Sequence, residues 1–254
     1  MTLPRRLATD LIVAFQFLTR IPTPQVPFAP DSLARAAAFF PAVGLALGAA
    51  AALLHRLLAP HLSRPLAALA VIAALVLATG ALHEDGLADA ADGFGGGRDR
   101  DQTLLILRDS RIGSYGALAL ILSVLARVLL LSSVPLRHVA ASLIAAETLS
   151  RWSSLPLTLL PAARPQNDLQ NGQGARLAQN VSRTTLLVGT LLAAAVSLFA
   201  LRQAAIAPIL LTAALVALGG RYFLRRLGGV TGDCFGAVIQ LTEIAVLCCG
   251  AWLP

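Results

Sequence analysis

Three aspartates recur at helical spacing in the segment HEDGLADAADGFGGG, which directly follows an apolar run. If the helix of that run continues through residue 92, Asp85, Asp89 and Asp92 fall within an arc of about 60°, because each residue turns a helix by about 100°. Three carboxylates on one face repel one another unless a cation lies among them, and hard oxygen ligands favour Mg²⁺ or Mn²⁺ over zinc. The spacing therefore predicts a magnesium site. The alternative is a solvated loop whose acids keep a helix end in water.

Glycines and arginines that follow these aspartates are typical of phosphate binding. Gly95 and Gly96 have no side chain to keep a phosphate away from backbone N–H groups. Arg108 and Arg111, in the segment LRDSRIGSYG, share a face of any helix there and are suited to hold phosphate oxygens. The alternative is that these arginines only flank a membrane span on its cytoplasmic side. The glycines of the same segment indicate a turn packed closely against another element.

A second group of ionisable residues lies further along the chain. Asp233, in VTGD, stands at the start of the last apolar run, and the Gly-Gly and Thr-Gly-Asp turns there are typical of close approach to an anion. Either Asp89 or Asp233 is the candidate catalytic base. Glu243 lies inside the last apolar run and is either functional or paired with an intramembrane arginine. Glu147 and Arg151 are spaced i, i+4, so they either neutralise each other or Arg151 binds substrate phosphate.

The composition predicts a membrane protein. Of the 254 residues, 57% are hydrophobic and 13% are charged, whereas a soluble domain carries about 25% charged residues. The chain contains no lysine, which excludes a Schiff-base lysine and a P-loop lysine. The net charge of +7 is attributed to basic loops at a membrane surface rather than to nucleic-acid binding. The three cysteines form no CxxC pair and no disulfide framework.

We predict an all-α, polytopic integral membrane protein that forms a single domain over residues 1–254. A span needs about 20 apolar residues, and about seven such runs occur, with six or eight as alternatives. The predicted spans are residues 36–54, 65–82, 113–134, 138–160, 184–201, 203–220 and 234–253. Arg127, inside the third span, is expected to snorkel toward the surface. The N-terminal residues are expected to form an amphipathic segment and not a signal peptide.

The distribution of arginines predicts the orientation, because cytoplasmic loops carry an excess of basic residues. The N-terminal side holds Arg5, Arg6, Arg20, Arg35, Arg98, Arg100, Arg108, Arg111, Arg164, Arg176, Arg183, Arg221, Arg225 and Arg226. The opposite side holds only Arg56, Arg64, Arg137 and Arg202. The polar loops 83–112, 161–183 and 221–233 all fall on the first side. We therefore expect these loops to be cytoplasmic and the protein to lie in the inner membrane.

The motifs together resemble those of one family. QFLTRIPTP at 16–24, HEDGLADAADGFGGG, RDSRIGSYG, SRW at 150–152 and GGVTGDCFGA are similar, in this order, to segments of the cobalamin synthases, or adenosylcobinamide-GDP ribazoletransferases. The resemblance implies a Mg²⁺-dependent membrane transferase that joins α-ribazole, or its 5′-phosphate, to adenosylcobinamide-GDP. GMP is released, and adenosylcobalamin or its 5′-phosphate is formed by this assembly of the nucleotide loop.

The resemblance also extends to individual positions. The three aspartates of the first segment match the family's acidic motif, Arg111 and Gly113 match its SRIG turn, and Asp233 matches its TGD. Two positions depart from the family: Glu84 replaces an apolar residue, and Gln240 replaces a common acid. By this resemblance, Mg²⁺ would bind to Asp85, Asp89, Asp92 and Asp233. The diphosphate would be held by this ion and by the side chains of Arg108 and Arg111.

Two other functions remain open. A membrane phosphotransferase of the CDP-alcohol type also carries a DG…D motif, but there Ala-Arg follows the DG pair, whereas here Ala88 is followed by Asp89. An ion-coupled transporter would use Glu147, Arg151 and Glu243 along an ion path, but it would need polar residues spread over several spans. The expected partners are the two substrates and the lipid bilayer, without nucleic acid. A homo-oligomer, or a complex with other cobalamin-assembly enzymes, is also left open.

Overall fold

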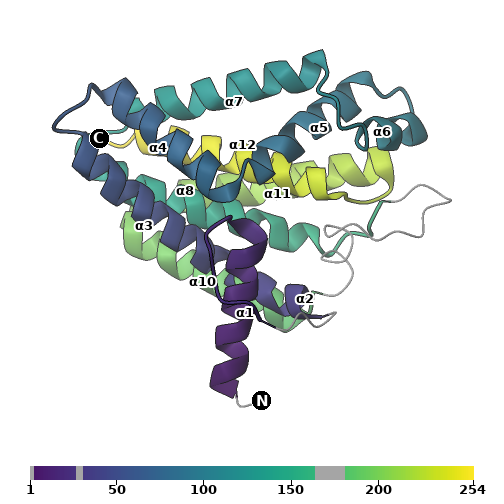
Figure 1. Cartoon of the computed structure of the whole chain (residues 1–254), viewed down its shortest axis with the longest axis horizontal. Helices are drawn as coiled ribbons and strands as arrows, with labels where there is room; N and C mark the ends of the chain where they lie inside the picture. The colour runs from purple at the N-terminus through teal and green to yellow at the C-terminus, as the bar shows by residue number, and fades with distance from the viewer. Residues whose placement is uncertain (1–2, 27–30, 164–180) are drawn as a thin grey trace.

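The computed structural model of this chain describes residues 3–26, 31–163 and 181–254. The described residues form α-helices and short 3₁₀ segments without strands, which confirms the all-α class (Figure 1). The helices are α1 (Leu3–Leu18), α2 (Ser32–Ala36), the 3₁₀ segment η1 (Ala37–Phe39), α3 (Phe40–Leu58), α4 (Arg64–Thr79), α5 (Leu82–Gly96), α6 (Arg100–Ile106), α7 (Ser114–Ser133), α8 (Leu136–Leu157), α10 (Arg183–Leu201), η2 (Arg202–Ala205), α11 (Ile206–Leu227) and α12 (Gly232–Ala251). Arg164 and Arg176, in one predicted polar loop, lie outside the described residues.

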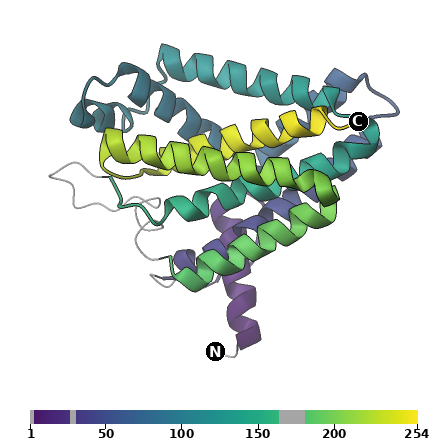
Figure 2. The ribbon, with the colours of Figure 1, turned by 180° about the vertical axis from the view of Figure 1, so that it is seen from behind.

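Long apolar helices make this a multi-pass membrane protein. Within the described residues, four helical stretches are long and apolar enough to cross a bilayer, namely residues 32–58, 114–133, 183–227 and 232–251, and the bent pair α4–α5 would be a fifth. The predicted number of about seven spans is therefore not confirmed. Stretch 183–227 folds back on itself at η2 (Figure 2), as expected for a tight hairpin between the fifth and sixth predicted spans.

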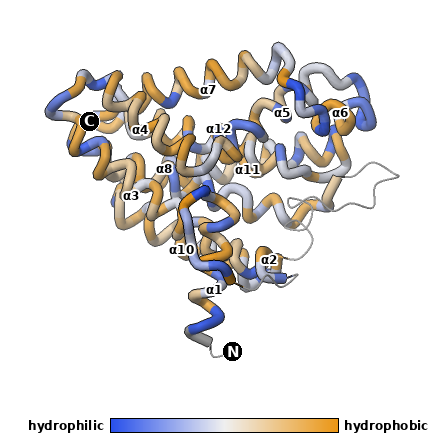
Figure 3. Tube along the Cα trace, viewed as in Figure 1, coloured by the Kyte–Doolittle hydropathy of each residue, from blue (hydrophilic) through white to orange (hydrophobic). Residues whose placement is uncertain are grey.

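The outward surfaces of these helices agree with a lipid environment. On α7 and α10, large apolar side chains such as Leu125, Leu129, Leu191 and Phe199 are exposed. A contiguous apolar surface of this kind would be unfavourable in water. Hydrophilic residues gather around α6 and at helix ends (Figure 3). Apolar flanks with polar ends are the pattern expected of a bundle that spans a membrane.

Two glycines on α3 let it pack directly on α8. A Cβ atom added to Gly44 would lie 2.8 Å from Thr148 Cα, and one added to Gly48 would lie 2.7 Å from Ile144 Cα. Glycines four residues apart allow two helix backbones to approach closely inside a membrane. Because α8 also contacts α10, α11 and α12, this close packing buries it in the middle of the bundle.

The chain turns sharply between the second apolar run and the acidic segment. Helix α4 ends before Gly80 (φ 65°), Ala81 is also left-handed (φ 59°), and α5 leaves at an angle of 89° to α4. Glycine after a helix favours such a stop because it adopts positive φ without strain. The assumption that one helix carries both segments is therefore wrong. Helix α5 is nevertheless continuous, so its aspartates share a face as predicted.

Replacing Gly44 with alanine should weaken the contact between α3 and α8. The added methyl group would meet backbone atoms that cannot move independently, so we expect the free energy of unfolding to fall by roughly 1–3 kcal/mol. Ala46→Leu, on the exposed side of the same helix, is the matched control and should have little effect. Reversible unfolding in mixed micelles measures both. Equal stability of Gly44→Ala and the wild type would contradict this account of the packing.

Candidate active site

Two glycines also allow α5 and α12 to touch. A Cβ atom added to Gly236 would lie 3.0 Å from Gly86 Cα, and one added to Gly86 would lie 3.2 Å from Asp233 Cα. The backbones are therefore in direct contact about one helical turn after Asp233, the aspartate at the start of α12. This contact brings the TGD segment beside the acidic stripe of α5, two motifs that are far apart in the sequence.

Four aspartates gather at this helix contact. The negative charges of Asp85, Asp92 and Asp233 all act on Asp89, and that of Asp85 acts on Asp233. Asp85 is exposed, whereas the other three are partly buried. Thr231 Oγ1 donates a hydrogen bond of 3.2 Å to Asp233 Oδ2 and holds that carboxylate at the start of α12. The arrangement concentrates negative charge where a cation or a hydrogen-bond donor would be stabilised.

Asp92 has a structural task within this group. Its two oxygens accept hydrogen bonds from the backbone N–H groups of Gly113 (2.7 Å) and Gly116 (2.8 Å) at the start of α7. A carboxylate satisfies the free donors of a helix N-terminus and complements its dipole. A Cβ atom on Gly116 would lie 2.9 Å from Ala88 O, so the expected close packing of this glycine turn is confirmed. Metal binding by Asp92 stays a prediction.

The carboxylate oxygens at this helix contact are of the kind that Mg²⁺ binds together with phosphate oxygens. Among the described residues, no three His, Cys, Asp or Glu side chains converge closely enough to hold a metal ion by themselves. Mg²⁺ commonly keeps several waters and binds through one or two carboxylates together with substrate phosphates. Asp85, Asp89 and Asp233 offer oxygens of the right kind on two adjacent helices. The chemistry of these donors is compatible with Mg²⁺, and the ion itself stays a prediction.

The predicted phosphate-binding arginines lie in the segment between α6 and α7. Arg111 is 87% exposed in its side chain and donates from Nε and Nη2 to Asp109, at 2.9 and 2.6 Å. The hydrogen-bonded guanidinium lowers the pKa of Asp109 to about 2, so this carboxylate stays ionised at neutral pH. Arg108 is also exposed. A phosphate that binds Arg111 would therefore compete with Asp109.

The two predicted phosphate-binding glycines are explained at least in part by packing. A Cβ atom on Gly95 would lie 2.7 Å from the ring of Tyr115, and one on Gly96 would lie 3.3 Å from Ile106. Both residues belong to the last turn of α5. The small size of Gly95 is thus required by the tyrosine of α7, and a role at phosphate stays a prediction for both glycines.

A buried arginine joins three of the helices around the site. Arg127 on α7 is 1% exposed and contacts Glu84 Oε1 of α5 at 2.9 Å and Glu243 Oε2 of α12 at 3.5 Å. Gln240 Nε2 also donates to Glu84 Oε1, at 3.2 Å, and accepts from Ser123. The expectation that Arg127 snorkels is wrong, because two carboxylates hold it inside. The alternative reading of Glu243, pairing with an intramembrane arginine, is confirmed.

Arg151 lies in a second buried ion pair. Its Nη1 is 2.7 Å from Glu147 Oε2 on the same helix and donates to Ser150 Oγ at 2.9 Å. The side chain is 2% exposed, so the expected mutual neutralisation of Glu147 and Arg151 is confirmed. Its Nε atom has no hydrogen-bond partner among the described residues, and a role of Arg151 at substrate phosphate stays a prediction. All three residues expected along a transporter path are thus in ion pairs: Glu147 pairs with Arg151, and Glu243 pairs with Arg127.

A small cavity adjoins the aspartates, and the sequence did not predict it. It has a volume of about 150 Å³, and Asp85 and Asp233 form part of its wall. His83 of α5 also lines it. His83 is 3% exposed, and its Nε2 atom has no hydrogen-bond partner in the described part of the chain. Five elements contribute to the cavity, and such a long-range assembly leaves no local signal in the sequence.

The sequence and its relatives identify the family to which this arrangement belongs. The sequence model of cobalamin-5-phosphate synthase matches residues 10–251. A Ralstonia nicotianae protein named adenosylcobinamide-GDP ribazoletransferase is 43% identical, covering 96% of this chain and 95% of its own length. Proteins of the same name from Mesorhizobium japonicum (42% identical, 96% and 93% covered) and Vibrio cholerae (37% identical, 92% and 90% covered) are also similar. No solved structure matches the chain.

Replacing Arg127 with methionine should destabilise the helices around the site. The substitution leaves Glu84 and Glu243 buried without their shared cation, and breaking a buried pair in this way costs roughly 3–5 kcal/mol. Adding Glu84→Gln should recover part of the loss, because one unpaired charge is then removed. Arg56→Met, on the exposed surface of α3, is the control. Unfolding in detergent measures all four proteins, and wild-type stability of Arg127→Met would refute this role for the arginine.

Proposed function

The chain belongs to the cobalamin-5-phosphate synthase family, and we propose that it is an adenosylcobinamide-GDP ribazoletransferase. It joins α-ribazole, or its 5′-phosphate, to adenosylcobinamide-GDP, which assembles the nucleotide loop of cobalamin. Relatives of that name cover almost the whole chain. The structural observation that carries the proposal is the position of Asp233 on α12 directly beside Asp85 and Asp89 on α5.

The reaction replaces a phosphoanhydride bond of the diphosphate with a phosphoester bond to ribazole. A ribazole hydroxyl attacks the phosphorus attached to cobinamide and loses its proton, while the bond from that phosphorus to the bridging oxygen breaks. GMP leaves with the bridging oxygen, and adenosylcobalamin or its 5′-phosphate remains. Such a transfer needs little covalent help from a protein and depends on positioning and charge neutralisation.

Magnesium is proposed as the cofactor because of the donors that surround the helix contact. Asp85 and one of Asp89 and Asp233 would hold it together with oxygens of the diphosphate, whose negative charge the ion would neutralise. Asp92 would support the site from behind by fixing α7 to α5. Whichever of Asp89 and Asp233 is not engaged by the ion would accept the proton of the attacking hydroxyl.

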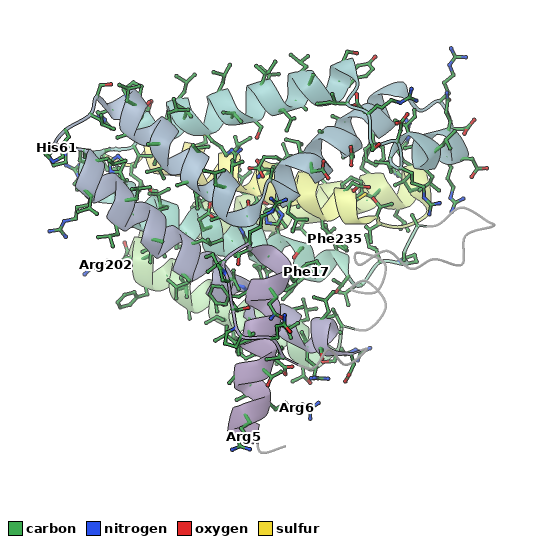
Figure 4. All side chains as sticks on the ribbon, in the orientation of Figure 1. Arg5, Arg6, Phe17, His61, Arg202 and Phe235 are labelled. Carbon is green, nitrogen blue, oxygen red and sulfur yellow. The ribbon has the colours of Figure 1, made fainter. Side chains whose placement is uncertain are left out.

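We also propose that the end of the bundle with α6 faces the cytoplasm in the inner membrane. That end carries Arg100 and Arg111 together with Arg225 and Arg226 at the end of α11. The turn with Arg202 lies at the opposite end (Figure 4). Positive residues are enriched on the cytoplasmic side of membrane proteins. The aspartates between α5 and α12 would then receive both substrates from the cytoplasm.

The substitutions Asp89→Asn and Asp233→Asn should each lower transferase activity by roughly 10²-fold or more. Each removes a carboxylate that would bind the metal ion or accept the proton of the attacking hydroxyl. The measurement is Mg²⁺-dependent release of GMP, with formation of the joined product, by membranes supplied with adenosylcobinamide-GDP and α-ribazole. Asp101→Asn, an exposed aspartate on α6, should retain normal activity. Normal activity of both Asp89→Asn and Asp233→Asn would show that these two aspartates have no part in the mechanism. If membranes with the wild-type protein form no product, the proposed reaction is refuted.

The substitution Asp109→Asn tests whether Arg111 binds the diphosphate. Removing the competing carboxylate should lower KM for adenosylcobinamide-GDP by a factor of about 2–5, the range expected for one exposed ion pair. Arg111→Gln should raise the same KM, and neither change should alter KM for ribazole. If Arg111→Gln has the KM of the wild type, the arginine is not part of the phosphate site. Steady-state kinetics with each substrate varied in turn gives these values.

A further inference from the structure

The cavity beside the aspartates has an aromatic side and a polar side. Phe17 of α1 stacks on Phe40 of α3, with ring centroids 5.6 Å apart and planes inclined by 10°. Phe235 and Ile239 reach the same cavity from α12. Figure 4 labels Phe17 and Phe235 next to each other where the end of α1 meets the bundle. Aromatic faces at such distances favour a planar ring as their neighbour.

The size of the cavity restricts what it can hold. Its volume is about 150 Å³, and an apolar cavity of about this volume in another protein takes up benzene. The cavity is also open on one side, so part of a larger group can extend beyond it. An aromatic base fits these dimensions, whereas the corrin macrocycle of the other substrate is many times too large. The cavity therefore suits the smaller of the two substrates of the proposed reaction.

The polar side fixes the direction in which a nucleoside would lie. Asp85 and Asp233 border the cavity, and the proposed function places the reacting hydroxyl at these carboxylates. A nucleoside whose ribose lies there would direct its base between the phenylalanines. Guanine carries several donors and acceptors that lose free energy if they are buried without partners. The walls offer few such partners, chiefly His83 and Ser154, which favours a base with mainly apolar edges.

We propose that this cavity binds the benzimidazole-type base of the ribazole substrate, with its ribose directed toward Asp85 and Asp233. The inference rests on the proposed function and assigns one of its substrates to a place in the fold. Phe17 and Phe40 cover one face of the base, and Phe235 and Ile239 close the cavity from α12. The diphosphate of the second substrate then lies on the far side of the carboxylates, toward α6 and Arg111.

Two substitutions change the cavity in opposite directions. Ile239→Phe fills it and should raise KM for ribazole by about tenfold or more, as expected for extra bulk in an apolar pocket. Phe17→Ala enlarges it and should improve the use of a nucleoside with a larger tricyclic base relative to ribazole. This second effect is a gain that a misfolded variant would not show. Phe199→Ala, on the outer surface of α10, is the matched control and should leave both values unchanged.

The kinetic test varies ribazole and adenosylcobinamide-GDP separately for each variant. The inference is supported if Ile239→Phe raises KM for ribazole alone and Phe17→Ala shifts the preference toward the larger base. It is overturned if both variants keep the KM for ribazole and change only that for adenosylcobinamide-GDP, because the cavity then holds guanine or another part of that substrate. It is equally overturned if neither KM nor the base preference changes.

Direct binding separates the inference from the proposed reaction. Calorimetric titration of the purified wild type with ribazole should give binding that Ile239→Phe weakens by about tenfold and that Phe199→Ala leaves intact. A protein that binds ribazole in this way but releases no GMP would refute the proposed transferase activity while supporting the cavity assignment. A protein that releases GMP, but whose ribazole affinity does not respond to Ile239→Phe, would refute the cavity assignment alone.

Discussion

Mutually repelling carboxylates can share a site in an apolar helical bundle only if the helices that carry them are held together. Here the backbones of α5 and α12 touch at Gly86 and Gly236, which places Asp233 beside Asp85 and Asp89. The same two helices are joined by Arg127, whose guanidinium lies between Glu84 and Glu243. Close backbone packing and a buried cation thus act on one interface, and they oppose the repulsion of the aspartates at its edge.

Helix α7 completes this support through two sets of polar contacts with α5. Arg127 makes the buried contact, and the first turn of α7 donates two backbone hydrogen bonds to Asp92. A side chain from one helix therefore satisfies the free N–H groups of another, which ties the end of the acidic stripe to the segment that carries Arg111. The aspartates and the arginine, which come from different parts of the sequence, are in this way parts of one connected framework.

The apolar runs and the spacing of the aspartates were sufficient to predict the helical class, the positions of the long helices and the shared face of the stripe on α5. Local sequence could not predict the stop at Gly80 and Ala81, because a glycine inside an apolar run is compatible with a continuing helix. The partners of Arg127 were also not predictable, since Glu84 and Glu243 lie on other helices far away in the chain. The cavity also depends on Phe17, which reaches it because the C-terminal end of α1 packs against the bundle (Figure 1).

The buried ion pairs on α7 and α8 both use arginine. A lysine in such a place can lower the cost of burial by giving up its proton, whereas a guanidinium keeps its charge under all physiological conditions. Arg127 is thus a permanent positive charge inside the protein. Glu84 and Glu243 therefore lie beside a positive charge that cannot be removed by deprotonation.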